Sequence, residues 1–388
     1  MPQNPAQPLR TALIGASGYG RYHYNLIGEM VAQGKMSLDA IVIINPMEIP
    51  EVVEECLRGG CAIYASVEAM LLAFRGRLDL VCIPTGIGTH APFTIAALES
   101  GANVLVEKPL AGTMAEVEAM EAASLRTGRT IFVGFQDIYR TDLHQIKKDL
   151  LRGVYGQLEE IRILGLWPRP QSYYTRNNWA GRIKSEKSFI YDSPANNALA
   201  HYLNMGLFLA GDQAEESACV SEIKAELYRA NEIESFDTIC ARISMGNGVK
   251  LHYAVSHAIE EVTEPVVKIM TKHHQLVLGS RANVLLTLQG ELLRELPFHG
   301  TEGGRTDMLG NIAKALRGEA SLVCKLGVAK AHTKTIVSLH QDNTIKTFAP
   351  DKIQIVQTES GPLVCVRGLS EKLQAAHRAG SLAIGALD

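Results

Sequence analysis

Short apolar stretches alternate with amphipathic stretches along the first third of the chain. Runs of strand length occur at residues 9–14, 38–44, 62–64, 80–83, 103–106 and 131–135. Apolar residues at helical spacing occupy the intervening segments 20–33, 49–59, 67–74, 91–100 and 114–127. Because strands that alternate with helices are typical of parallel sheets, the pattern predicts a doubly wound α/β domain over residues 9–136.

The pattern changes after about residue 136. A helical segment at 143–151 and a strand at 158–166 precede an aromatic, arginine-rich loop. Alternating polarity at 223–229, 238–244, 249–257, 266–271 and 275–278 then predicts a mostly antiparallel, open sheet, with helices at 306–316 and 327–340. We therefore expect a C-terminal α+β domain over 137–343. A strand at 353–358 and a helix at 371–378 indicate a C-terminal extension, 344–388, packed on the domains.

Composition and charge narrow the class of protein. The chain has 388 residues, enough for two domains, and a formal net charge of −3, which favours neither nucleic acid nor a membrane as a partner. Residues 1–8 are expected to be disordered and lack the order of a signal peptide, and apolar runs fall short of the roughly 18 residues of a membrane helix. The seven cysteines are scattered without a CxxC pair, so a reducing, cytoplasmic location is expected.

No metal site is predicted from the histidines. His273 and His274 are adjacent in a strand-rich region, so their side chains should point to opposite faces. His252 and His257 are an odd number of residues apart, so in a strand their side chains should also point to opposite faces.

A glycine-rich segment, GASGYG, lies between the first strand and the first helix. Glycines at this position allow a tight turn, and the amino end of the following helix can bind a pyrophosphate, as in Rossmann domains. The alternative is a glycine-rich turn without a ligand, but its place in a βαβ unit favours the binding interpretation. The cofactor candidates of this turn are Gly15, Ser17, Gly18, Tyr19 and Gly20.

Two positions depart from the usual dinucleotide pattern. Ser17 replaces the second glycine of GxGxxG, and Asn45 follows the second strand, where an Asp or Glu ordinarily accepts hydrogen bonds from ribose. Asn can still form a hydrogen bond with ribose, which favours NAD, but it does not repel a 2′-phosphate, so NADP is not excluded.

Three segments carry a family resemblance. GASGYGRYH (15–23), DLVCIPTGIGTHAPFTIAALESGANVLVEKP (79–109) and NNALAHYLNMGLFLAG (196–211) resemble the glucose-fructose oxidoreductase, inositol dehydrogenase and MocA (Gfo/Idh/MocA) family. The resemblance implies hydride transfer between a nicotinamide cofactor and a hydroxyl-bearing carbon of a sugar, inositol or related polyol. We also expect a homo-oligomer. Further cofactor contacts are expected at Pro84, Thr85, His90, Glu107, Lys108 and Pro109.

The resemblance also assigns catalytic candidates. Lys108, in the EKP motif, is expected beside the nicotinamide, where partial burial would lower its pKa and let it hold or move the hydroxyl proton. His201 matches a family histidine that follows an Asp by four residues on a helix. Here Asn197 replaces that Asp, and Asn204 replaces a later acidic residue. The alternatives are a surface lysine and a packed helical histidine.

Aromatic, amide and guanidinium groups converge in the loop WPRPQSYYTRNNWAGR, residues 167–182. Sugars stack their CH faces on aromatic rings, and their hydroxyls form directional hydrogen bonds. The alternative is an interface or lid loop. The substrate candidates are Trp167, Tyr173, Tyr174, Arg176, Asn177 and Arg182.

Two other functions stay open at this stage. One is an NAD-dependent glycosidase of the same fold, and the other is a non-catalytic, dinucleotide-binding regulator. Net production of NADH would distinguish the first, and the retention of Lys108 and His201 argues against the second.

Overall fold

The computed structural model describes residues 7–185, 188–382 and 384–385 and divides into two compact units. The first unit consists of the chain up to Arg140 together with Glu302–Ala329. The second unit consists of Thr141–Thr301 and the chain from Lys330 onward. Of the expected disordered segment 1–8, residues 1–6 lie outside the described residues.

The domain boundaries expected from the sequence, 9–136, 137–343 and 344–388, treat each domain as one continuous stretch. In the structure, residues 302–329 instead group with the first unit. The Val133 N–H donates to the Cys324 carbonyl at 2.8 Å, and Phe132 forms an isolated antiparallel bridge with Lys325. A pairing between segments this far apart has no periodic signal in the sequence.

The first unit contains a six-stranded sheet in the order β3-β2-β1-β4-β5-β6, and every neighbouring pair is parallel. The chain order reverses between β1 and β4, which is where a doubly wound sheet binds ligands at the carboxyl ends of its strands. The strands are β1 (Leu9–Ile14), β2 (Met36–Val42), β3 (Ala62–Tyr64), β4 (Leu80–Ile83), β5 (Asn103–Val106) and β6 (Ile131–Val133).

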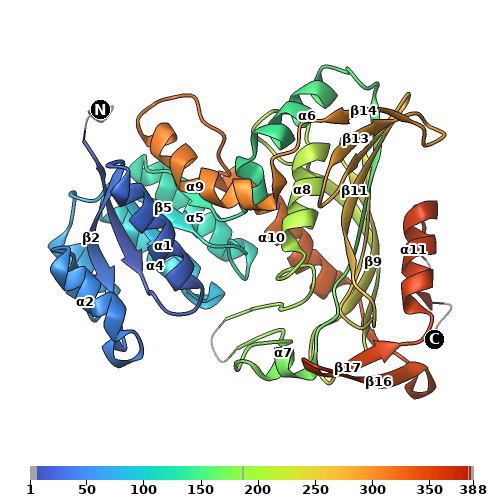
Figure 1. Ribbon diagram of the computed structural model, residues 1–388, viewed down its shortest axis with the longest axis horizontal. Helices are drawn as coiled ribbons and strands as arrows, with labels where there is room; N and C mark the ends of the chain where they lie inside the picture. The colour runs from blue at the N-terminus through green and yellow to red at the C-terminus, as the bar shows by residue number, and fades with distance from the viewer. Residues whose placement is uncertain (1–6, 186–187, 383, 386–388) are drawn as a thin grey trace. The chain divides into compact units, whose positions relative to one another are not determined.

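Helices cover this sheet (Figure 1). They are α1 (Tyr19–Ala32), α2 (Pro50–Arg58), α3 (Val67–Ala73), α4 (Ile87–Glu99) and α5 (Met114–Thr127), with short 3-10 turns η1 (Pro46–Glu48) and η2 (Gln136–Tyr139). The strands β4 and β5 are buried along their whole length, as expected for a sheet packed on both faces.

The second unit contains a nine-stranded sheet in the order β14-β13-β12-β11-β7-β10-β9-β8-β15. Its pairs are antiparallel except β7 with β10 and β8 with β15. The predicted fold class is therefore confirmed. The strands are β7 (Leu158–Leu166), β8 (Val220–Arg229), β9 (Thr238–Met245), β10 (Lys250–Ser256), β11 (Thr263–Thr271), β12 (Gln275–Leu278), β13 (Asn283–Leu286), β14 (Leu292–Leu296) and β15 (Ile345–Thr347).

The two faces of this sheet are covered by helices from different parts of the chain. The helix α8 (Ala200–Ala210) contacts β7 and β10 on one side, and α11 (Leu369–Ala379) contacts the same strands on the other side (Figure 1). A short helix, α7 (Gln171–Thr175), contacts β17 (Gly361–Val366), which pairs with β16 (Ile353–Thr358). The remaining helices are α6 (Thr141–Leu151), α9 (Gly300–Leu316) and α10 (Leu326–Asp342).

A glycine sets the distance between α8 and the sheet. A Cβ at Gly206 would lie 2.8 Å from Ile163 Cδ1 and 2.9 Å from Leu251 Cδ1, so a side chain there would displace the helix. The helix that carries His201 is thus seated closely on β7 and β10.

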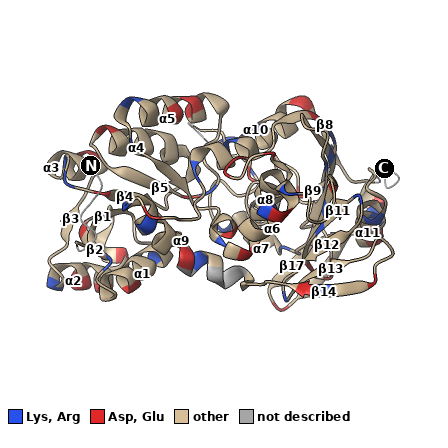
Figure 2. Ribbon diagram, turned by 90° about the horizontal axis from the view of Figure 1, so that it is seen from above, with Lys and Arg blue, Asp and Glu red and all other residues tan. Residues whose placement is uncertain are grey.

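Acidic and basic residues are interspersed over the helices of both units (Figure 2). Within the described part of the chain, no helix is long and apolar enough to cross a bilayer.

Candidate functional site

The glycine-rich turn between β1 and α1 has a backbone that side chains would disturb. Gly15 and Gly18 have φ angles of 86° and 55°, in the left-handed region that favours glycine. A Cβ at Gly20 would lie 2.5 Å from the Gly15 carbonyl oxygen. Gly18 caps α1 without a side-chain hydrogen bond, so the amino end of this helix is suited to an anionic pyrophosphate.

The turn after β4 lies against the glycine-rich turn. A Cβ at Gly20 would be 3.7 Å from Pro84 Cγ, and a Cβ at Gly15 would be 4.0 Å from Thr85 Cγ2. The structure thus brings these four predicted cofactor residues together at the carboxyl ends of β1 and β4. This is the point where the strand order reverses.

His90, another predicted cofactor residue, connects two backbone segments. Its Nδ1 lies 2.9 Å from the Pro109 carbonyl oxygen, and its Nε2 lies 3.0 Å from that of Thr85. Burial lowers the pKa of His90, although both carbonyl groups oppose the shift. Because both ring nitrogens face protein carbonyls, His90 is suited to positioning the EKP segment and not to contacting a ligand.

Glu107 lies buried at the end of β5 and forms a hydrogen bond with His23. His23 Nε2 is 2.8 Å from Glu107 Oε1, and the Lys108 N–H donates to Glu107 Oε2 at 3.1 Å. A Cβ at Gly134 would overlap this carboxylate. The Glu107 carboxylate is therefore bounded by His23, the Lys108 N–H and Gly134, next to half-buried Lys108. His23 lies one helical turn after Gly20 and was not among the predicted site residues.

Asn45 lies just beyond β2 and is exposed. Its Nδ2 donates to Glu48 Oε1 at 2.6 Å. A carboxylate therefore stands beside the amide at the position where Rossmann domains contact ribose.

Asn197, in the second unit, contacts a carboxylate that was not among the predicted site residues. Its Nδ2 donates to Asp192 Oδ1 at 2.9 Å and to Tyr173 Oη at 3.2 Å. Asp192 is 5% exposed and accepts the Gly181 N–H at 2.7 Å. A carboxylate therefore lies beside Asn197, the residue that replaces the family Asp. It belongs to Asp192, nine residues before His201, in a loop where no periodicity indicates it.

The expectation that Asn197 and His201 share one helix is wrong. The helix α8 begins at Ala200, and Asn197 lies in the preceding series of turns, where its N–H donates to Ser193 O at 2.9 Å. Pro194 follows Ser193 in this turn. His201 lies in the first turn of α8 and is half-buried. Asn204 is fully buried, and its amide atoms have no hydrogen-bond partner within the described chain.

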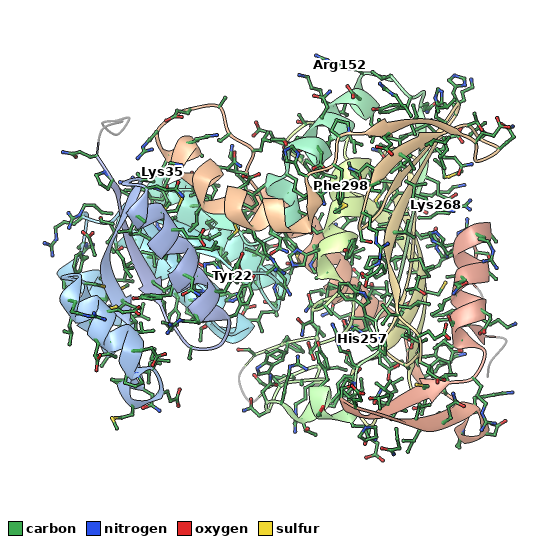
Figure 3. All side chains as sticks on the ribbon, in the orientation of Figure 1. Tyr22, Lys35, Arg152, His257, Lys268 and Phe298 are labelled. Carbon is green, nitrogen blue, oxygen red and sulfur yellow. The ribbon has the colours of Figure 1, made fainter. Side chains whose placement is uncertain are left out.

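The aromatic and arginine-rich loop forms a layered cluster around Tyr173 on α7. The Arg176 guanidinium carbon lies 3.6 Å from the Tyr173 ring centroid, and that of Arg169 lies 5.2 Å away. Arg169 also lies 5.7 Å from the Trp167 ring, and His257, labelled in Figure 3, has its ring centroid 5.8 Å from that of Tyr173. Arg169 and His257 were not among the predicted site residues.

The remaining loop candidates line a separate hollow of about 560 Å³. Tyr174, Asn177 and Arg182 contribute to its wall. Asn177 Oδ1 accepts the Trp179 and Ala180 N–H groups at 3.1 and 2.8 Å, and Arg182 pairs with Glu234 at 3.6 Å. Asn177 therefore stabilises the turn that follows it, and Arg182 forms an ion pair with Glu234.

Comparisons with known proteins agree with this arrangement. Residues 9–135 match the model of an oxidoreductase family with an NAD-binding Rossmann fold (Gfo/Idh/MocA). An uncharacterized oxidoreductase, YdgJ of Escherichia coli K12, is 35% identical over 134 residues, which are 34% of this chain and 36% of the relative. An inositol 2-dehydrogenase/D-chiro-inositol 3-dehydrogenase of Halalkalibacterium halodurans is 26% identical over 53% of this chain and 54% of the relative. The matched regions thus span between about a third and a half of these relatives.

Most of the chain is similar in fold to solved oxidoreductases. The WlbA dehydrogenase of Chromobacterium violaceum, solved with NADH and UDP-GlcNAcA, has a TM-score of 0.70 at 21% identity, over 88% of this chain and 95% of that one. An oxidoreductase of Agrobacterium radiobacter, solved with NAD⁺, L-tartaric acid and magnesium, has a TM-score of 0.67 at 16% identity, over 86% and 95%.

Proposed function

Because residues 9–135 belong to the Gfo/Idh/MocA family of NAD-binding oxidoreductases, we propose that this protein is an NAD-dependent dehydrogenase or reductase. It acts on a hydroxyl-bearing carbon of a sugar, inositol or related polyol. The observation that carries the proposal is the close approach of Gly20 to the Gly15 carbonyl at the amino end of α1, at the reversal of strand order.

The first unit is suited to hold NAD. The positive φ angles of Gly15 and Gly18 and the amino end of α1, which has no side-chain cap, fit a pyrophosphate, and Pro84 and Thr85 line the same edge. The Glu48 carboxylate beside Asn45 supports ribose hydroxyls over a 2′-phosphate, because a phosphate would meet like charge. The nicotinamide ring supplies the chemistry of accepting or donating a hydride.

Lys108 is proposed to hold or move the proton of the reacting hydroxyl. It follows Glu107, whose carboxylate is fixed by His23 and by the Lys108 N–H, so the backbone at the end of β5 is firmly oriented. A half-buried lysine can act near neutral pH when burial lowers its pKa.

His201 is proposed as a second acid/base group, and Asn197 as the residue that orients the substrate hydroxyl beside it. Asp192 and Tyr173 hold the Asn197 amide by accepting its N–H groups. The loop residues Trp167, Tyr173 and Arg176 are proposed to contact the substrate.

One experiment tests this function directly. Wild-type protein and Gly15→Val are titrated with NADH, and wild type is screened with sugars, inositols and sugar acids for NAD reduction. The proposal requires NADH binding that Gly15→Val weakens and net NADH production with at least one substrate. Binding without turnover would support a regulator, and turnover without net NADH would support a glycosidase.

A further inference from the structure

Two arginines flank Tyr173 without a carboxylate partner. Their guanidinium carbons lie 5.2 Å (Arg169) and 3.6 Å (Arg176) from the ring centroid. Their side chains donate to the backbone carbonyls of Pro168 and Tyr173, and neither has an ion pair within residues 7–185 and 188–382. Two positive charges therefore share one short segment with no direct neutralising contact.

Arg169 has a buried hydrogen-bond donor without an acceptor among the described residues. The donor is its Nε–H. Burying part of a charged group without a partner is unfavourable, so such a donor is a natural contact for an anionic ligand.

The nearby carboxylates are already held by other donors. Asp192 accepts from Gly181 and Asn197, as described above. Asp237 is fully buried and accepts from the Ala230 and Asn231 N–H groups and from the side chains of Asn231 and Thr238. Neither carboxylate satisfies the Arg169 Nε–H.

His257 adds an unused acceptor to this cluster. Its Nδ1 lies 2.6 Å from the Trp167 carbonyl oxygen and must donate to it, which leaves Nε2 as an acceptor. Nε2 is buried and lacks a partner among the described residues. Burial, and then the charge of Arg169, lower the pKa of His257 to about 3, so the ring is neutral near pH 7.

We propose that Arg169 and Arg176 bind an anionic group, a carboxylate or a phosphate, on a sugar-like substrate, and that His257 Nε2 accepts a hydrogen bond from a neighbouring hydroxyl. This subsite rests on the proposed function and narrows its substrate class to acidic or phosphorylated sugars. It adjoins Asn197, because the Tyr173 hydroxyl accepts an N–H of the Asn197 amide. Guanidinium groups suit both anions, since their N–H groups match paired oxygens.

The test is a calorimetric titration of the full chain, saturated with NADH, using D-glucuronate, D-glucose 6-phosphate and D-glucose. We expect at least one anion to bind about ten-fold or more tightly than glucose. Arg169→Gln should weaken that anion by about 10- to 100-fold, as for loss of a charge-assisted hydrogen bond. Arg169→Lys should be intermediate, because it keeps the charge and loses the planar group. The anion that responds distinguishes a carboxylate from a phosphate.

Arg281→Gln is the matched control, because Arg281 is exposed in the turn between β12 and β13. Equal binding of all three sugars, no binding of either anion, or anion binding unaffected by Arg169→Gln would overturn the subsite. NADH affinity should stay constant across the variants. Turnover of a neutral sugar that Arg169→Gln leaves unchanged would refute the subsite and keep the proposed function. Anion binding that is lost in Arg169→Gln, without turnover of any sugar, would support the subsite and refute the proposed function.

Discussion

The Asn197 side chain donates to Asp192 across 2.9 Å, which gives the segment before His201 a carboxylate from a different position than the family pattern provides. Asn197→Asp should therefore not simply restore the family arrangement. The new carboxylate would face Asp192, and two carboxylates at this distance cannot both ionise without a penalty, so one should take up a proton near neutral pH.

The measurement is thermal unfolding against pH for Asn197→Asp, Asp192→Asn and the double exchange. We expect Asn197→Asp to be destabilised above pH 6. The double exchange should recover most of the loss, because it returns one carboxylate and one amide to the pair. Equal stability of Asn197→Asp and wild type at pH 8 would contradict this.

Loss of the side chains proposed to handle the hydroxyl proton should reduce turnover without unfolding the protein. His201→Asn and Lys108→Met are each expected to lower kcat by about 100- to 10,000-fold, as is typical of a missing general acid or base. The check is kcat and NADH affinity measured side by side, once a substrate is known. If His201→Asn left both kcat and the pH profile intact, His201 would be only a packed residue of α8.

Gly20→Ala should weaken NADH binding by ten-fold or more. The added methyl would lie 2.5 Å from the Gly15 carbonyl oxygen, so the turn must open. Gly28→Ala is the control on the same helix, because a Cβ there meets nothing within 4 Å. The control should keep NADH affinity and gain about 0.5–1 kcal/mol of stability. Similar NADH affinity in both variants would contradict the turn geometry.

His23→Leu should destabilise the first unit by about 1–3 kcal/mol. Glu107 would stay buried with one donor fewer, and an unsatisfied buried acceptor costs free energy in that range. Adding Glu107→Gln should recover part of the loss, because the neutral amide is less costly to bury. Denaturant unfolding followed by fluorescence measures both. Additive losses in the double variant would show that the two side chains are not coupled.

Lys147 should make stability depend on pH. It is buried, and its ammonium donates to the carbonyls of Phe208 and Glu216. Burial lowers its pKa to about 7, although the charges of Asp212 and Glu216 oppose the shift. Between pH 7 and about 10.5, the unfolded chain binds more protons at this site than the folded chain. Folding stability should therefore rise with pH in this window.

The comparison is with Lys147→Met, which removes the titration. The free energy of unfolding of wild type, relative to this variant, should rise by up to about 1.4 kcal/mol per pH unit between pH 7 and 9.5 and be flat below pH 6. Lys148→Met, at the exposed neighbouring position, should show no such slope against wild type.

The sequence predicted the elements whose apolar runs are buried on both faces. β4 and β5, which are buried along their whole length, have the predicted bounds, and so does β7. β13 and β14 were missed, since four of the five residues in LLREL of β14 are exposed and the strand packs little. The helix α4 begins at Ile87, four residues before its predicted start, with Pro92 in its interior.

The candidate site was predictable only where a local motif reports it. The glycine-rich turn and the EKP segment lie next to strand ends, so their position follows from the βαβ pattern. The candidate site also contains Asp192, Arg169 and His257, which reach it through contacts between loops and a strand end. Such contacts depend on how the second unit folds, and neither spacing nor periodicity indicates them.

The helix α11 packs on β7 and β10, on the face of the nine-stranded sheet opposite α8. Leu369, Leu373 and Ala376 belong to the same buried cluster as Leu164 and Leu166 of β7. Because α11 is tethered to this face, its effective concentration there is on the order of millimolar. A second copy of the chain at micromolar concentration would be outcompeted for the area that α11 covers, so self-association through that area requires release of α11.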